Sequence, residues 1–412
     1  MNKIAVIGGG AAGIMAATRI MELQGENEVF LIERNNVLGK KVLISGGGRC
    51  NLTTGLSDLK EVLQKYPRGA RFLRTCLHSF PPTALIEWME EHGVPLKTEA
   101  DQRVFPESDN GKDVVDAFQK VLKQSGANIF FETTLKSITK QDKKFVLNFE
   151  ERETLEVDKV ILCAGGQAYR HTGSSGDGYS FAESLGHSIT DLGPSLNAFL
   201  LAEKWPQNLS GLSFKQVTLT FRGQEKFSFK GGTMFTHKGV TGPGIFALSA
   251  LAAYENFDQN SPAKLGIDFF PEQNHEQLQQ SFYEKLEKNP KKVFSKILKS
   301  FIPKSFAEEL CAQLEIPTSK LCSEFKKKDL NKIIDALKNL PLTIIGRVAG
   351  GEFVTAGGVN LTEVNPKTME SKLCPGLYFG GEILNYDGFT GGFNLQAAWS
   401  TGRLAGESAI LS

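Results

Sequence analysis

The chain has 412 residues, of which 41% are hydrophobic and 23% are charged. This length and composition predict a globular protein of two or three domains and exclude a disordered or fibrous one. The formal net charge of +1 gives no overall basic field that would attract nucleic acid. We therefore expect a small-molecule substrate and no nucleic-acid partner, and the oligomeric state stays open.

Cysteine usage and the N-terminal segment bear on the cellular setting. The six cysteines form no CxxC pair and no cluster with metal-ligand spacing, so no metal site is expected. The start MNKIAVIGGG enters an apolar strand at its fourth residue, unlike a secretory signal. No apolar run approaches the length of a membrane span. These features predict a reducing, cytoplasmic setting without a membrane partner.

The first predicted elements are a strand, a glycine turn and a helix within KIAVIGGGAAGIMAATRIM. Gly8, Gly10 and Gly13 form G-x-G-x-x-G, which lets a pyrophosphate approach the backbone at a helix N-terminus. A second apolar run, EVFLIE, ends in Glu33, at the spacing where an acid binds ribose hydroxyls. An AMP-bearing dinucleotide is predicted here, bound by Gly8, Gly10, Ala11, Ala12, Gly13, Glu33 and Arg34.

The next feature is KKVLISGGGRCNLTT, with three consecutive glycines. Bare glycine backbone suits the edge of an isoalloxazine ring, because a Cβ would push the ring away. A turn that needs glycine only for its own conformation is the alternative. Cys50 has no partner thiol at short spacing, so we expect it to pack rather than to relay electrons. The flavin interpretation assigns Lys40, Ser45, Gly46, Gly47, Gly48, Arg49, Cys50 and Asn51 to the cofactor, with Arg49 pairing with an acid or with cofactor oxygens.

Two later segments also end apolar strands in glycine. The first, VDKVILCAGGQAY, is expected to pass the cofactor. The second is predicted to form a strand that returns to the FAD-binding domain and then a helix, within GLYFGGEILNYDGFTGGFNLQAAWSTGRLAG. The positive end of that helix would face the flavin N1 and C2 carbonyl, where reduction places negative charge, and Glu382 would accept hydrogen bonds from ribityl hydroxyls. These segments add Ala164, Gly165, Gly166, Gly381, Glu382, Gly391, Gly392, Phe393 and Asn394 to the predicted FAD site.

Between these segments the residue pattern changes twice. Apolar and polar residues alternate in FKQVTLTFRGQEKFSF, which predicts a β-barrel-like insert over residues 192–271. Residues 272–340 show helical spacing, and their many lysines alternate with acids, which indicates solvated helix faces rather than an RNA-binding or membrane surface. The chain then returns through the barrel over 341–355. The flanking parts, 1–191 and 356–412, are predicted to form one split α/β, Rossmann-like FAD-binding domain.

Three side chains are candidates for catalysis. Tyr169 follows the strand that should pass the flavin, together with His171, and His237 lies between glycine turns in GGTMFTHKGVTGPG. An imidazole or phenol there would donate a proton to substrate. Arg103 in QRVFPESD would orient a substrate carbonyl or carboxylate. The structural alternatives are a surface or capping loop residue for the histidines and a domain-bridging salt link for Arg103.

Four motifs together resemble a known family. GKKVLISGGGRCNLT, RVFPESDNGKDVV, MFTHKGVTGPGIFALS and GGEILNYDGFTGGFNLQAAWSTGRLAG occur in the order seen in the HI0933-like (BaiN-type) family of bacterial flavoproteins. The resemblance covers nearly the whole chain. It implies FAD, an oxidoreductase activity, a split FAD-binding domain, a small β-barrel and a helical insert.

The leading functional hypothesis is an FAD-dependent reductase that passes hydride from flavin N5 to a small acceptor such as a conjugated carbonyl compound. NAD(P)H is the expected electron donor, although no second G-x-G-x-x-G follows a strand, so it would visit the flavin without a recognisable site of its own. An FAD-dependent nucleic-acid-modifying enzyme and a noncatalytic flavin-binding sensor are the alternatives.

Overall fold

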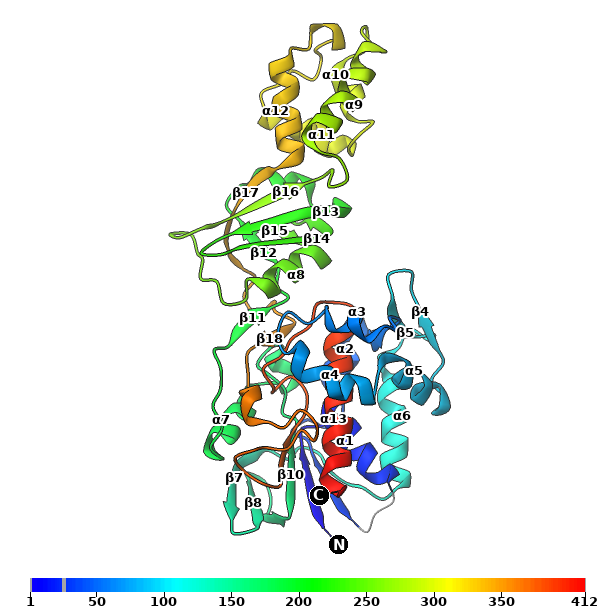
Figure 1. Cartoon of the computed structure of the whole chain (residues 1–412), viewed down its shortest axis with the longest axis vertical. Coiled ribbons are helices and arrows are strands. Elements are labelled where there is room, and N and C mark those ends of the chain that lie inside the picture. The colour runs from blue at the N-terminus through cyan, green and yellow to red at the C-terminus, as the bar shows by residue number, and fades with distance from the viewer. Residues whose placement is uncertain (1, 24–26, 412) are drawn as a thin grey trace. The chain divides into compact units, whose positions relative to one another are not determined.

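The computed structural model describes residues 2–23 and 27–411, which form two compact units. Unit 1 comprises Met1–Ser195 and Glu352–Ser412, and unit 2 comprises Leu196–Gly351. Figure 1 shows that the blue N-terminal and red C-terminal segments both belong to unit 1. Unit 1 is therefore built from both ends of the chain, and unit 2 is a single insertion.

The centre of unit 1 is a five-stranded parallel sheet in the order β19-β10-β1-β2-β6. Its strands read as short, continuous apolar runs because both faces are covered. Strand order reverses beside β1, which has β2 on one side and β10 on the other, and ligands of open α/β sheets bind at the carboxyl ends of strands at such a point. The strands are β1 (Lys3–Ile7), β2 (Glu28–Ile32), β6 (Asn128–Phe130), β10 (Lys159–Leu162) and β19 (Leu377–Phe379).

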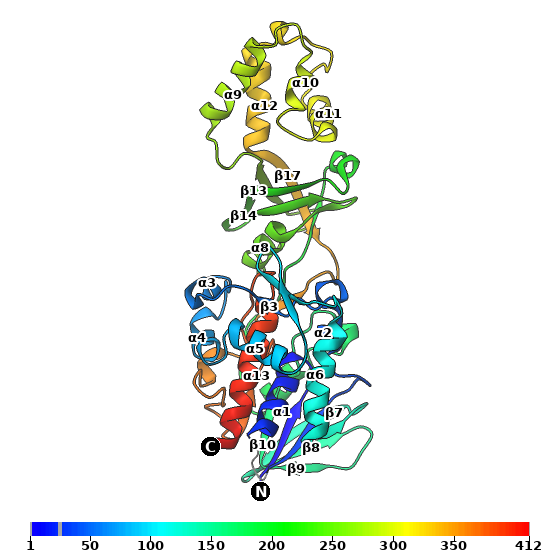
Figure 2. The same ribbon diagram turned by 90° about the vertical axis from the view of Figure 1, so that its right-hand side faces the viewer.

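Helices α1 and α13 lie side by side in Figures 1 and 2, and small residues allow their close contact. A Cβ added to Gly402 would lie 2.1 Å from the carbonyl oxygen of Ala12, and one added to Gly406 would lie 2.5 Å from that of Ala16. The helices of unit 1 are α1 (Ala11–Glu22), α2 (Lys40–Ile44), α3 (Leu59–Leu63), α4 (Ala70–Ser79), α5 (Pro82–Glu91), α6 (Gly111–Gln124), α7 (Asp177–Ser184) and α13 (Phe393–Leu411).

Three smaller antiparallel sheets complete unit 1. One has the order β3-β5-β4, another is the meander β7-β8-β9, and β11 pairs with β18 where the chain leaves and re-enters the unit. Their strands are β3 (Thr53–Thr54), β4 (Leu96–Thr98), β5 (Arg103–Pro106), β7 (Leu135–Gln141), β8 (Lys144–Phe149), β9 (Leu155–Val157), β11 (Gly193–Ser195) and β18 (Val354–Ala356).

Unit 2 contains a closed barrel of six strands in the order β12-β15-β14-β13-β16-β17. Val217, Leu219 and Phe221 are fully buried, and the residues between them are more exposed, as the alternating sequence predicts for a strand with one face inside. Helix α8 (Pro243–Leu251) packs on the barrel. The strands are β12 (Phe199–Leu201), β13 (Ser213–Arg222), β14 (Lys226–Phe235), β15 (Gly239–Thr241), β16 (Ala263–Asp268) and β17 (Leu340–Arg347).

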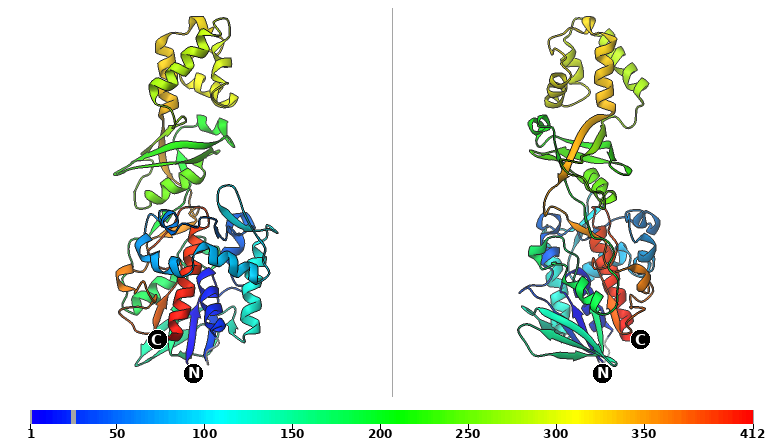
Figure 3. Two further views of the ribbon diagram at one scale, coloured as in Figure 1. Left: turned by 45° about the vertical axis from the view of Figure 1, so that its right-hand side comes forward. Right: turned by 90° about the vertical axis from the view of Figure 1, so that its left-hand side faces the viewer.

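Four helices connect β16 to β17, and Figure 3 shows them gathered as one group. On α12, Leu330, Ile333 and Leu337 are buried, whereas Lys328 and Lys332 are exposed. These two lysines therefore face solvent, whereas Lys338 at the end of α12 is largely covered and binds Asp268. Among the described helices, none is both long and apolar enough to cross a membrane. The helices of the insert are α9 (His275–Glu287), α10 (Phe294–Leu298), α11 (Lys304–Gln313) and α12 (Lys327–Lys338).

Candidate functional site

The turn after β1 lies at the carboxyl edge of the parallel sheet. Gly8 has φ +99°, and a Cβ there would lie 2.6 Å from the carbonyl oxygen of Cys163. A Cβ on Gly13 would lie 1.8 Å from the carbonyl oxygen of Gly8. Gly10 differs, because its Cβ would meet no protein atom within 4 Å. Gly8 and Gly13 are thus required by the fold, while Gly10 leaves space at the N-terminus of α1, where backbone N–H groups favour an anion.

Glu33 directly follows β2 and is 7% exposed. Its Oε2 accepts a hydrogen bond from the Gly9 N–H at 2.7 Å, and its Oε1 accepts two from Asn35, at 2.7 Å from the backbone nitrogen and 2.6 Å from Nδ2. A carboxylate offers about four acceptor positions, so about one remains for a hydroxyl. That arrangement suits a residue which both fixes the turn and receives a ribose hydroxyl.

Arg34 and Lys40 have protein partners. Arg34 donates from Nη1 to Ser175 Oγ at 2.7 Å, and its Nη2 pairs with the Asp177 carboxylate. Lys40 donates to Asn35 Oδ1 at 3.2 Å. Both side chains therefore bind the surroundings of β2, and Arg34 ties the end of this strand to the start of α7.

The glycine triplet lies in a short 3-10 turn over Ser45–Gly48, and Ser45 Oγ donates to the carbonyl oxygen of Val42 at 2.7 Å. Gly46, Gly47 and Gly48 have φ values of +58°, +72° and +90°, a left-handed conformation that favours glycine. The backbone alone thus explains why glycine is needed. A Cβ on Gly47 or Gly48 would nevertheless meet no protein atom within 4 Å, so this turn also has an open side.

Cys50, at the end of this turn, is fully buried. Burial raises the pKa of its thiol to about 12. The thiol is therefore protonated at neutral pH and is neither a nucleophile nor half of a redox pair with another described cysteine, all of which are free. The structure thus gives Cys50 a packing environment.

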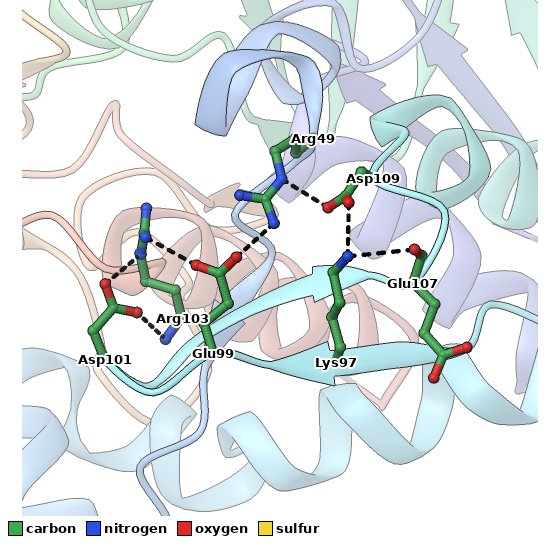
Figure 4. Close-up of polar contacts among 7 residues, drawn as sticks. All are labelled: Arg49, Lys97, Glu99, Asp101, Arg103, Glu107 and Asp109. Carbon is green, nitrogen blue, oxygen red and sulfur yellow. Dashed lines mark hydrogen bonds and ion pairs between the residues drawn. The ribbon is translucent and has the colours of Figure 1, made fainter.

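Arg49 points away from the turn and into an ion-pair network (Figure 4). It donates from Nη2 to Glu99 Oε1 at 2.6 Å and from Nε to Asp109 Oδ1 at 2.7 Å. Its guanidinium lies 3.9 Å from the ring centroid of Phe105, a cation–π distance. Hydrogen bonds from Lys97 and then from Arg49 hold the pKa of the Asp109 carboxyl below its usual value. Arg49 thus links the glycine turn to the β4–β5 hairpin.

Arg103 belongs to the same network, and Figure 4 shows Glu99 between the two arginines. Arg103 donates from Nη2 to Glu99 Oε2 at 2.9 Å and from Nε to Asp101 Oδ2 at 2.8 Å. Its salt links are therefore local to the hairpin rather than between domains. A role in orienting substrate stays a prediction for this residue.

The turn after β10 meets the C-terminal segment at Glu382. The Oε1 atom of Glu382 accepts from the Thr355 N–H at 2.9 Å, and its Oε2 pairs with Lys41 Nζ at 2.7 Å. A Cβ on Gly166 would lie 2.8 Å from Glu382 Oε1, and one on Gly381 would lie 2.8 Å from Ala12 Cβ. The segments containing Ala164, Gly165, Gly166, Gly381 and Glu382 are thereby brought against α1 and α2.

The segment leading into α13 is tightly held. A Cβ on Gly392 would lie 2.2 Å from the carbonyl oxygen of Thr53, and Gly391 has φ +126°. Asn394 accepts from the Gly388 N–H at 2.8 Å and donates to its carbonyl oxygen at 2.7 Å, closing the loop. Phe393 then begins α13. The N-terminus of this helix is thus fixed beside β3.

Tyr169 is the candidate acid that shares a unit with these segments. It is half-buried and has φ +56° and ψ +51°, a left-handed conformation that is uncommon for an aromatic residue and concentrates at functional sites. Its ring stacks 5.9 Å from Phe353 and lies 6.0 Å from Lys41 Nζ. Burial, and then the negative charge of Glu352, raise the pKa of Tyr169 above its usual value. Its hydroxyl therefore stays protonated at neutral pH.

His237 belongs to unit 2. It is exposed in the turn between β14 and β15 of unit 2. The other candidate residues belong to unit 1. Its role as a substrate-side acid therefore stays a prediction.

Two buried oxygen atoms test whether these residues fit a flavin dinucleotide. Asn51 Oδ1 and Asn385 Oδ1 are buried, and neither has a hydrogen-bond partner among the described residues. An unpaired buried acceptor is costly and indicates a missing donor. The isoalloxazine N–H and the ribityl hydroxyls of FAD are donors of this kind. Together with the open sides of Gly10, Gly47 and Gly48, these atoms fit FAD.

The comparison with known families decides the identity of the chain. The model of the HI0933-like protein Rossmann domain matches residues 2–408. The chain belongs to the HI0933-like family. This confirms the family predicted from the four sequence motifs, and the Rossmann-type fold with an inserted barrel is confirmed as well.

Two relatives illustrate the family. The chain is 32% identical over 412 residues to the 3-dehydro-bile acid delta(4,6)-reductase of Clostridium scindens, covering 99% of each chain. It is 26% identical over 400 residues to the ribosomal RNA dihydrouridine synthase of Escherichia coli, covering 96% of this chain and 95% of the relative.

Among solved structures, the 3-ketosteroid-delta4-(5alpha)-dehydrogenase of Rhodococcus jostii RHA1 superposes with a TM-score of 0.53 at 14% identity, covering 99% of this chain and 97% of that chain. This likeness concerns the fold alone. The family match and the full-length similarity to the bile-acid reductase identify this HI0933-like protein as an FAD-dependent oxidoreductase, as the sequence predicts.

Sequence reasoning missed Lys41, which lies next to the predicted Lys40. The two lysines stand together in KKVLI, and nothing in that short run tells which one faces the C-terminal segment. The structure gives the pairing with Glu382 to Lys41. The signal available in the sequence was that Glu382 lies in one glycine-rich motif and needs a basic partner, which another glycine-rich motif could supply.

Arg49→Ala is expected to weaken FAD binding by roughly two- to tenfold, because the glycine turn loses its link to the hairpin and populates the binding-competent conformation less. Titrating apoprotein with FAD and following flavin fluorescence measures the effect, which should shrink at high salt. Lys112→Gln, which removes an exposed ion pair with Asp116 on α6, is the control. Wild-type affinity in Arg49→Ala would contradict the role of this network.

Proposed function

We propose that this protein reduces a carbon–carbon double bond conjugated to a carbonyl group. Bound FAD in its reduced form supplies the hydride for such a reaction. The observation that carries the proposal is Tyr169, whose protonated phenol follows β10 at the carboxyl edge of the sheet, on a backbone in the left-handed conformation. Its ring lies beside Lys41, which pairs with Glu382. A proton donor of this kind completes the reduction at the carbon next to the carbonyl.

Different residues at the carboxyl edge of the sheet would bind different parts of FAD. The open side of Gly10 and the N-terminus of α1 would receive the pyrophosphate, and Glu33 would hold the adenosine ribose. Gly47, Gly48 and the unpaired oxygen of Asn51 would face the flavin. The N-terminus of α13 would add the positive end of its dipole.

The relatives support a reductase of an activated double bond. The Clostridium scindens relative is named as a delta(4,6)-reductase of a 3-dehydro-bile acid, and it is similar over the full length of the chain. We carry over the class of chemistry and not the substrate. NADH or NADPH is proposed as the donor that reduces the flavin.

A second candidate is reduction of uridine in RNA. The Escherichia coli and Haemophilus influenzae relatives, 26% and 27% identical, are named ribosomal RNA dihydrouridine synthases. The C5–C6 double bond of uridine is conjugated to a carbonyl, so the same proton donor would serve both substrates. The exposed Lys326, Lys327, Lys328 and Lys332 at α12 favour this candidate, whereas the net charge of +1 disfavours it.

Separate half-reactions test the proposal. Under anaerobic conditions, the holoenzyme is expected to lose its oxidised flavin absorbance on addition of NADPH or NADH. Addition of a panel of enones should then restore it, with the saturated ketone as product. Restoration only by a ribosomal RNA transcript would favour the second candidate. Failure of both nicotinamides to reduce the flavin would favour the noncatalytic sensor.

A further inference from the structure

Lys41 lies where three segments that are distant in the sequence meet. It is the second residue of α2, its Nζ lies 2.7 Å from Glu382 Oε2 of the C-terminal segment, and it lies 6.0 Å from the ring centroid of Tyr169 after β10. The side chains of Lys41 and Glu382 are 27% and 18% exposed. The ion pair is therefore largely shielded from solvent, so its field acts on neighbouring groups more strongly than that of a surface pair.

Glu382 and Lys41 differ in how many of their acceptor or donor positions have hydrogen-bond partners. Glu382 has a partner on each oxygen, the Thr355 N–H at 2.9 Å and Lys41. An ammonium group carries three donors, and among the described residues Lys41 uses one of them, toward Glu382. Two N–H donors thus remain on a side chain that contacts the C-terminal segment and the turn after β10.

The neighbouring lysine has a different environment. Lys40 donates to Asn35 Oδ1 at 3.2 Å, next to the residues that fix Glu33. Two adjacent lysines in one short helix therefore carry the same charge to different ends of the candidate site. Lys40 is therefore a comparison for Lys41, because the two share residue type, helix and net charge.

We infer that Lys41, held by Glu382, is the positive charge that stabilises negative charge on the flavin ring. This inference rests on the proposed function in placing the flavin beside Tyr169. A fixed cation near the ring favours every process that places negative charge there, including reduction. The other cations of the candidate site are engaged elsewhere: Lys40 binds Asn35, and Arg49 and Arg103 are paired with carboxylates of the hairpin and its flank.

Sulfite provides a probe that needs neither substrate nor nicotinamide. Its sulfur lone pair forms a bond to N5 of oxidised flavin, and an electron pair moves onto the N1–C2 region, which bleaches the visible absorbance. Lys41→Gln is expected to weaken sulfite binding at least tenfold. It is also expected to lower the flavin midpoint potential by about 30 mV, which corresponds to tenfold for a two-electron couple. Lys40→Gln removes the same charge from the other end of the candidate site and is expected to weaken sulfite binding less than Lys41→Gln does. Lys112→Gln, on α6, is the control that should match wild type in both measurements.

Two further variants test the inference independently through the direction in which sulfite affinity changes. Lys41→Arg keeps the charge and should retain most sulfite affinity. Glu382→Gln removes the counter-charge and should tighten sulfite binding in whatever fraction retains FAD. If Lys41→Gln does not bind FAD, the sulfite affinities of these two variants still test the inference. Wild-type sulfite affinity in Lys41→Gln, an equal loss in Lys40→Gln, or weaker sulfite binding in Glu382→Gln would overturn the inference. The sulfite result stands apart from enone reduction, so failure of the proposed function is detected separately.

Discussion

Gly10→Ala is expected to weaken FAD binding by about 10- to 100-fold and to leave the apoprotein fully folded. The backbone of Gly10 has φ −79°, which alanine adopts freely, and the added methyl would meet no protein atom within 4 Å. It would instead occupy the space left for the pyrophosphate, and overpacking by one methyl costs about 1–3 kcal/mol. Fluorescence titration of apoprotein with FAD measures the loss, and thermal unfolding of the apoprotein shows that the fold is kept.

Gly13→Ala is the matched comparison for Gly10→Ala. Its methyl would lie 1.8 Å from the carbonyl oxygen of Gly8, so the strand, the turn or the helix must move. We expect a loss of about 3 kcal/mol or more in stability with or without FAD. The two glycines of one motif therefore separate a cofactor contact from a folding constraint. Wild-type FAD affinity in Gly10→Ala would remove the assignment of this turn to the pyrophosphate.

The fold was largely predictable because its signals are local. The apolar run of β1, the glycine turn and the small-residue helix α1 follow one another within the first 22 residues, and their order alone indicates a Rossmann-like unit. Alternation in β13 likewise indicated a strand with one buried face. Each of these patterns spans a single element, so no knowledge of distant residues was needed.

Partners of charged side chains were not predictable in the same way. Arg49 and Arg103 share Glu99 because the β4–β5 hairpin folds back beside the glycine turn, and that pairing depends on tertiary structure. The orientation of Lys41 rather than Lys40 toward Glu382 depends on how one five-residue helix is placed. The candidate site could therefore be located from sequence by its glycines, whereas its charge arrangement required the structure.

Tyr169→Phe is expected to keep FAD and its reduction by the nicotinamide donor, while reoxidation by the organic acceptor slows by about 10²- to 10⁴-fold. Phenylalanine keeps the stacking on Phe353 and removes only the hydroxyl that would give its proton to the substrate carbon. Stopped-flow absorbance of the flavin measures the two half-reactions separately. Tyr283→Phe, in the helical insert, is the control and should match wild type in both.

The pH dependence gives this assignment a second readout. Because burial and Glu352 raise the pKa of Tyr169, the protonated donor persists through neutral pH, and reoxidation should slow only above the ordinary tyrosine pKa of about 10. That alkaline limb should be absent in Tyr169→Phe. Equal slowing of both half-reactions would instead indicate a structural role for the ring. If reoxidation were unchanged in Tyr169→Phe but lost in His237→Ala, the proton would come from the exposed turn between β14 and β15 of unit 2.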